Sequence, residues 1–176
     1  LQIHKDKSEP WKITFVDTGQ DTMTGGRIKK IKKYLNKDED FFLTYGDGVA
    51  NINIKKLYAF HKSRKKLATL TAINHKGRFG MIKIDSKYNV NSFIEKPSNK
   101  NNLINGGFFV LNPKVINYIK NSKTIWEKEP LTELANQNNL SAYMHKGFWH
   151  PMDTLRDKIY LQNLWQGSKC PWKIWK

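Results

Sequence analysis

The sequence predicts a three-layer α/β fold, in which a mostly parallel sheet has helices on both faces. Short apolar, β-prone runs alternate with segments whose apolar residues recur at helical spacing. One hairpin, "FGMIKID" and "NVNSFIEK" around a polar "SKY", is inserted into this alternation. Strands that alternate with helices are typical of parallel sheets, because parallel neighbours need a crossover connection. With 176 residues, of which 39% are hydrophobic, the chain is long enough for one sizeable core.

The first half of the chain contains five expected elements besides the hairpin. Alternation, helical spacing or a buried apolar run identifies each of them. Asn53 is a residue type that often caps a helix. The expected elements are a strand over 12–17, a helix over 23–35, a strand over 41–45, a helix from Asn53 and a strand over 67–73.

The second half continues the alternation. Asn112-Pro113 is a helix N-cap followed by a first-turn proline, and Thr154 is a second candidate N-cap. The expected elements are a strand over 104–111, a helical segment from Pro113, a helix over 130–137, a strand over 141–149 and a helix over 155–166.

The composition and net charge of the chain limit the classes of function. The net charge is +16, which suggests a nucleic-acid-binding module as an alternative. However, all but four of the 31 basic residues are lysine and they are spread along the chain, whereas recognition of phosphates and bases favours clustered arginine. We therefore do not expect nucleic acid as a partner.

The single cysteine, Cys170, allows no intrachain disulfide and fits a reducing, cytoplasmic compartment. No apolar run approaches the roughly 20 residues that cross a bilayer, so no membrane partner is expected.

Two aspartates stand just beyond predicted strands. Asp47 follows "FFLTY", and Asp153 lies just past "SAYMHKGFW". Ligands of open α/β sheets bind beyond the carboxyl ends of the strands, so neighbouring strands would bring both carboxylates to one edge. Mg²⁺ is typically held by one or two carboxylates together with substrate phosphates. Gly46 and Gly48 would let a phosphate or sugar approach the backbone closely. The pattern predicts a magnesium site.

Each aspartate has a simpler interpretation. Asp47-Gly48 is a strong hairpin signal, although the following "NINIKKLYAFHK" favours a helix over a second strand. Asp153 could serve as a helix cap or as a charge in the first helical turn. Thr154 can do the capping, which would leave Asp153 available.

Three further motifs are weaker alone. "MTGGR" offers backbone N–H groups and a guanidinium to a base or phosphate, but no Lys-Ser/Thr follows to make a P-loop, so a plain loop is the alternative. "EKP" joins a carboxylate to an ammonium, and a solvated pair at a sheet edge is its alternative reading. Glycines in the strand "INGGFFVL" indicate a bulge or a ligand that approaches closely. The five histidines form no metal-ligand spacing.

These motifs, taken in order, resemble the sugar-phosphate nucleotidylyltransferases, and within them the glucose-1-phosphate cytidylyltransferases. The strings that carry the resemblance span nearly the whole chain: "VDTGQDTMTGGRIKKIKKYL", "TYGDGV", "GRFG", "FIEKP", "INGGFFVL", "GFWHPMDTLRDK" and "LWQGSKCPWKIWK". The resemblance implies a Rossmann-like, three-layer nucleotidyltransferase fold, with residues 1–176 as a single partial domain. It also implies the reaction of CTP with α-D-glucose 1-phosphate to give CDP-glucose and diphosphate, for dideoxyhexose and O-antigen synthesis.

The resemblance also implies roles for particular residues and an oligomeric enzyme. Asp47 and Asp153 would be catalytic metal ligands for Mg²⁺, and Lys96 would be a catalytic cation on the sugar-phosphate side. Thr22, Gly25, Gly26, Arg27 and Gly46 would bind CTP. Gly80, Glu95, Lys96, Asn105 and Gly106 would bind the sugar phosphate. A nucleotidylyltransferase with another base or sugar preference is the alternative inside this class, and a homo-oligomer is expected.

One departure from the family pattern matters. The family opens with a strand, a glycine-rich turn that contains an arginine, and a Pro-Lys-Pro, and the sequence has no counterpart of them. We therefore expect the chain to be N-terminally truncated. Because the loss of a single donor to developing charge can cost roughly 100- to 1,000-fold in rate, we expect little or no activity from the isolated chain.

Overall fold

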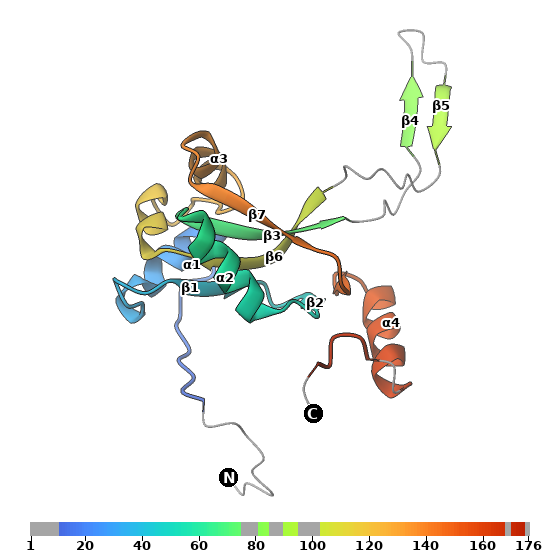
Figure 1. Cartoon of the computed structure of the whole chain (residues 1–176), viewed down its shortest axis with the longest axis horizontal. Coiled ribbons are helices and arrows are strands. Elements are labelled where there is room, and N and C mark those ends of the chain that lie inside the picture. Colours follow the sequence, from blue (N-terminus) through green and yellow to red (C-terminus); the bar gives the residue numbers. More distant parts are fainter. Residues whose placement is uncertain (1–10, 75–80, 85–89, 95–102, 168–169, 175–176) are drawn as a thin grey trace, which may run out of the picture.

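A four-stranded sheet is the centre of this computed structural model, which describes residues 11–74, 81–84, 90–94, 103–167 and 170–174. β3 pairs in parallel with β7, whereas β6 pairs antiparallel with both β1 and β3. β1, β3 and β7 therefore point the same way and β6 opposes them, which confirms an α/β fold with a mostly parallel sheet (Figure 1). The strands lie in the order β1 (Phe41–Thr44), β6 (Leu103–Leu111), β3 (Ala68–Asn74) and β7 (Leu140–His145).

The direction of β6 follows from its connection to β3. The expected hairpin is present between them as β4 (Met81–Ile84) and β5 (Val90–Ile94), which pair antiparallel. A chain that leaves β3 through a hairpin returns beside it in the opposite direction, without the crossover helix that a parallel return requires. A third, two-stranded sheet consists of β2 (Gly48–Ala50) and β8 (Trp149–Pro151), also antiparallel.

The expected helical segments are present, although the one expected over 23–35 is α-helical only to Lys30 and then continues as a 3-10 helix. The three predicted N-caps are observed, and at Asn112 the side chain accepts a hydrogen bond from the Lys114 N–H. The Asn53 side chain accepts a hydrogen bond from the Lys56 N–H at the start of α2, and Thr154 forms a capping box with Asp157 at the start of α4. None of the helices in the described ranges is long and apolar enough to cross a membrane. The helical elements are α1 (Thr24–Lys30), η1 (Ile31–Tyr34), α2 (Ile54–Arg64), η2 (Pro113–Tyr118), α3 (Glu129–Asn136) and α4 (Leu155–Gln166).

Helices pack on both faces of the sheet, which gives the three layers. Phe109 and Leu111 of β6 belong to the larger apolar cluster, with buried side chains from α1, η2 and α3. Val110, between them, belongs to a second cluster with Leu57 of α2. This alternation is that of a strand buried on both faces. Each such aliphatic or aromatic side chain contributes about 1.5–3 kcal/mol when fully buried.

Two expected strands differ from the observed structure. Residues 12–17 are not a strand: they have no ladder partner in the described part of the chain, and Trp11, Ile13 and Phe15 are 74%, 65% and 93% exposed. Alternation gives a strand its two faces, but a neighbour has to supply the hydrogen bonds. The expected strand over 141–149 divides into β7 and β8, which belong to different sheets.

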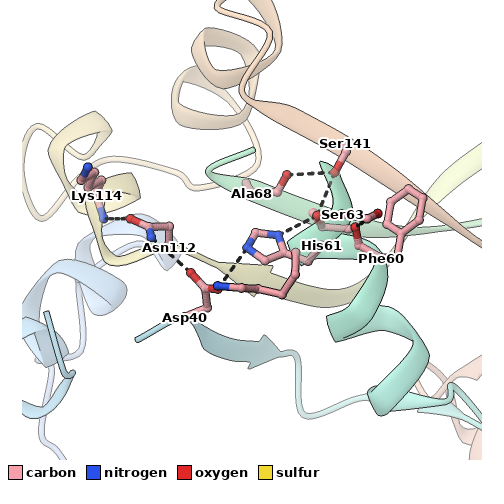
Figure 2. A network of polar contacts seen from close by, with 10 residues as sticks. Asp40, Phe60, His61, Ser63, Ala68, Asn112, Lys114 and Ser141 are labelled. Carbon is pink, nitrogen blue, oxygen red and sulfur yellow. Dashed lines mark hydrogen bonds and ion pairs between the residues drawn. The ribbon is translucent and has the colours of Figure 1, made fainter. Parts of the chain in front are cut away.

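A buried polar network lies at the sheet edge where β1, β3 and β7 begin (Figure 2). His61 of α2 contacts Thr69 through Nδ1 (2.8 Å) and Asp40 through Nε2 (3.5 Å). Asp40 also accepts hydrogen bonds from Lys62 (3.0 Å) and Asn112 (3.2 Å). The network links α2, β3, the residue before β1 and the residue after β6, so His61 is a packing residue.

Candidate active site

Asp47 and Asp153 lie at the same end of the β2–β8 ladder. The last paired residues on that side are Gly48 and Pro151, and the Met152 N–H then donates a hydrogen bond to the Asp47 carbonyl (2.8 Å). Asp153 is the next residue. Two aspartates that are 106 positions apart in the numbering are therefore neighbours across one ladder. β1 and β2 belong to different sheets, so Asp47-Gly48 is not the turn of a hairpin between them.

The donor chemistry of this end of the ladder suits a hard divalent cation. Both aspartates are exposed, and among the described residues neither carboxylate takes part in a hydrogen bond or ion pair. Thr154 and Asp157 cap α4, so Asp153 is not needed as a cap. No cluster of three or more His, Cys, Asp or Glu side chains occurs in the described ranges. Two carboxylates with room for phosphate and water oxygens are what Mg²⁺ sites typically use.

The Asn-Gly-Gly segment of β6 lies beside the end of β1. The Tyr45 N–H donates to the Gly107 carbonyl (3.2 Å), and the Gly107 N–H donates to Asn105 Oδ1 (3.0 Å). Gly107 has φ +75°, and a Cβ there would lie 2.7 Å from the Tyr45 ring. The Gly106 carbonyl accepts a hydrogen bond from Trp149 Nε1 (2.9 Å), which joins β6 to β8. Asn105 and Gly106 thus lie next to the elements that carry both aspartates.

Gly25 and Gly26 allow the start of α1 to pack closely on residues 122–126. A Cβ on Gly26 would lie 2.4 Å from the Ser122 carbonyl oxygen, and one on Gly25 would lie 2.8 Å from that of Thr124. The Gly26 N–H donates to the Thr124 carbonyl (3.2 Å). The glycine pair therefore has a packing role, and CTP binding by it stays a prediction.

Thr22 and Arg27 hold the turn that precedes α1. The Arg27 guanidinium donates to Thr18 Oγ1 and to the Gln20 carbonyl (3.1 Å). Thr22 is buried, and its hydroxyl donates to the Thr18 carbonyl (2.5 Å). Arg27 is exposed. Within the described residues no hydrogen bond joins either residue directly to Asp47 or Asp153.

The link between these motifs runs through two residues that sequence reasoning missed, Tyr45 and Glu127. The Tyr45 hydroxyl and the Thr24 hydroxyl each donate to the Glu127 carboxylate. Burial, and then the hydrogen bond to Glu127 and the negative charge of that carboxylate, raise the pKa of Tyr45. Thr24, Arg27, Tyr45 and Glu127 also border one cavity of about 200 Å³. Glu127 lies in an irregular segment without periodicity, so the sequence carried no signal for it.

Gly46 precedes Asp47 and has no atom within 4 Å of the position its Cβ would take, so the backbone is accessible there. Three of the sugar-phosphate candidates, Gly80, Glu95 and Lys96, lie outside the described residues, although β4 and β5 directly adjoin them.

Comparison with known proteins identifies a family to which the chain matches and curated relatives of similar sequence. The family model described as nucleotidyl transferase matches residues 2–161. The glucose-1-phosphate cytidylyltransferase of Salmonella typhi is 53% identical over 176 residues, which cover all of this chain and 68% of the relative. The probable glucose-1-phosphate cytidylyltransferase of Bacillus subtilis is 44% identical over 168 residues, covering 95% of this chain and 65% of the relative. The relatives are thus about half as long again as this chain.

Solved structures share the fold. HddC from Yersinia pseudotuberculosis superimposes with a TM-score of 0.63 at 23% identity, over 88% of this chain and 68% of that chain. A UDP-glucose pyrophosphorylase structure gives a TM-score of 0.64 at 16% identity, over 88% and 66%. From the family match over most of its length, the chain belongs to the nucleotidyl transferase family.

Proposed function

We propose that this chain has the glucose-1-phosphate cytidylyltransferase function, in which CTP and α-D-glucose 1-phosphate give CDP-glucose and diphosphate. The observation that carries the proposal is the ladder contact between Asp47 and Met152, which makes Asp47 and Asp153 neighbours. The 53% identity to the Salmonella typhi enzyme supports the choice of base and sugar. Members of the family act on a nucleoside triphosphate and a sugar phosphate, and they generally use a divalent metal ion.

Asp47 and Asp153 would hold Mg²⁺, because exposed carboxylate oxygens are the ligands that this ion prefers. When bound, the ion supplies positive charge that neutralises and orients the triphosphate. Thr22, Gly25, Gly26, Arg27 and Gly46 would line the CTP site. Glu95, Lys96, Asn105, Gly106 and Gly80 would bind the sugar phosphate.

The reaction needs positioning more than covalent chemistry. A phosphate oxygen of the sugar phosphate forms a bond to the α-phosphorus of CTP, the bond to the β-phosphate breaks, and diphosphate leaves with the electron pair. No covalent enzyme intermediate is required, so alignment and charge neutralisation carry the catalysis. Arg27 would supply positive charge to CTP and Lys96 would supply it to the sugar phosphate, which would help to bring two polyanions together.

Diphosphate release from CTP and glucose 1-phosphate tests the proposal. We expect release only with Mg²⁺, a lower rate with UTP or dTTP, and a loss of at least about 100-fold on Asp47→Asn. Asp38→Asn, an exposed acid outside the site, is the matched control. Faster release with another nucleotide would favour the alternative base preference.

The isolated chain is expected to be slow. The same comparisons of nucleotides and variants are therefore also made in a chimera that adds the residues of the Salmonella typhi relative that have no counterpart in this chain. We expect the chimera to be much faster than the chain alone. A chimera that folds but releases no diphosphate with any nucleotide would contradict the proposed function.

A further inference from the structure

Glu127 connects two motifs that lie far apart in the sequence. One carboxylate oxygen accepts a hydrogen bond from the Tyr45 hydroxyl, and the other accepts one from Thr24 Oγ1 at 2.7 Å. Thr24 Oγ1 in turn accepts a hydrogen bond from the backbone N–H of Trp126 at 2.9 Å. Both carboxylate oxygens of Glu127 therefore have a partner, and each partner belongs to a different motif of the proposed site.

Buried rings anchor this link. Trp126 is fully buried, and its ring meets the edge of Phe109 with centroids 6.1 Å apart. The Phe109 ring meets the Tyr45 ring in the same way at 5.9 Å. Trp126, which precedes Glu127, and Tyr45, which contacts Glu127, thus both pack on the core side chain Phe109. This packing fixes the Glu127 backbone although its own side chain is exposed.

The chemistry of the pair favours the same arrangement. The Tyr45 hydroxyl is the donor and the Glu127 carboxylate is the acceptor. A hydrogen bond from a neutral donor to a carboxylate is roughly twice as strong as one between neutral groups.

The two ends of the link lead to the two halves of the site. Tyr45 is two residues before Asp47, the candidate metal ligand, and Thr24 is three residues before Arg27, a candidate CTP ligand. We propose that Glu127 is a positioning residue, which holds the start of α1 and the end of β1 in one register so that CTP and its metal ion are bound together. This inference rests on the proposed function and deepens it.

CTP binding to the 176-residue chain with Mg²⁺, measured by titration calorimetry, tests the role. We expect Glu127→Ala to weaken binding about 10- to 100-fold, the range typical for partners that orient site ligands. Tyr45→Phe and Thr24→Val, which each remove one hydroxyl, should give part of this loss, and Thr24→Ser should restore it. Glu129→Ala is the matched control, because Glu129 is two residues away and its side chain forms an exposed ion pair with Lys120.

Steady-state kinetics of the chimera separate positioning from folding. A positioning role predicts a higher KM for CTP with an unchanged KM for glucose 1-phosphate. A loss of folded protein would lower kcat and leave both KM values unchanged. The proposal would be overturned if Glu127→Ala bound CTP as tightly as the wild type. It would also be overturned if this variant lowered kcat and left both KM values unchanged.

Amide hydrogen exchange of the ligand-free chain keeps the two proposals distinguishable. Glu127→Ala should speed exchange both at residues 22–27 and at residues 45–48, which are far apart in sequence, whereas Glu129→Ala should change neither. If neither the chain nor the chimera binds CTP but both segments respond, the link is supported and the proposed function fails. If the wild type binds CTP and the two segments do not respond together, the function stands and the link is wrong.

Discussion

Gly107 and Gly46 both lie near the proposed site, but neighbouring atoms and the backbone conformation restrict a side chain only at Gly107. Gly107 has φ +75°, and a Cβ would meet the Tyr45 ring at 2.7 Å. Gly46 has nothing within 4 Å of its Cβ position. Left-handed backbone and a close ring are both unfavourable for a side chain.

We predict that Gly107→Ala lowers the free energy of unfolding by about 1–3 kcal/mol, and that Gly46→Ala changes it little. Urea unfolding of both variants measures this difference. Equal stabilities of the two variants would show that Gly107 is not constrained by Tyr45. Gly46→Ala should instead weaken CTP binding if the backbone there lies against the nucleotide.

At the scale of elements, the network around His61 should make stability depend on pH. Burial lowers the pKa of His61 more than Asp40 raises it. Burial opposes ionisation of Asp40, but hydrogen bonds from Lys62 and Asn112 outweigh it and lower the pKa of Asp40. The unfolded chain therefore takes up protons before the folded chain does at both groups, so stability falls as the pH falls.

We predict that His61→Gln, which keeps an amide near Asp40 but removes the ring that titrates, flattens the loss of stability from pH 7 to pH 5. The decline through the lower range where Asp40 titrates should remain. Urea midpoints at several pH values measure this difference. A wild type whose midpoint does not change from pH 7 to pH 5 would contradict the role of His61.

Elements whose signals are local could be predicted from the sequence. The caps at Asn53 and Thr154 depend on a few adjacent residues, and both are observed. The strand expected at 12–17 and the continuous strand at 141–149 required partners that alternation does not specify. The direction of β6 depended likewise on the hairpin before it.

The site was partly predictable for a related reason. Asp47 and Asp153 each follow a strand-like run, and both were expected beyond the ends of neighbouring strands. However, β1 and β7 are the two outer strands of the order β1-β6-β3-β7, and the two residues are neighbours through the β2–β8 ladder instead. A metal site shared by the two carboxylates stays a prediction. Tyr45 and Glu127 could not be paired, because 82 positions separate them and Glu127 lies in an irregular segment. Their contact exists only after the end of β1 and the segment before α3 have packed together.

At the scale of the molecule, β1 is an edge strand of the four-stranded sheet in the described part of the chain, and the segment 11–15 exposes three large apolar side chains. Unpaired strand edges and exposed apolar residues promote association between chains. We predict concentration-dependent self-association of the 176-residue chain.

Ile13→Lys with Phe15→Lys should reduce this self-association. Ile174→Lys, a change of the same kind at an exposed residue near the other end, should have a smaller effect. Sedimentation velocity over a range of concentrations measures both. Association that is unchanged by the double substitution would mean that another surface is responsible, α4 with its exposed Leu155 and Ile159 being the next to test.

The most direct test of the account is the affinity for a divalent ion in the presence of CTP, measured with Mn²⁺ by electron paramagnetic resonance. If Asp47 and Asp153 share one ion, Asp47→Asn and Asp153→Asn should each weaken its binding about 10-fold or more, and the loss in the double variant should differ from the sum of the two single losses because both carboxylates bind the same ion. Asp38→Asn should bind as the wild type does. Independent, additive losses, or single variants that bind the ion as tightly as the wild type, would contradict a shared metal site.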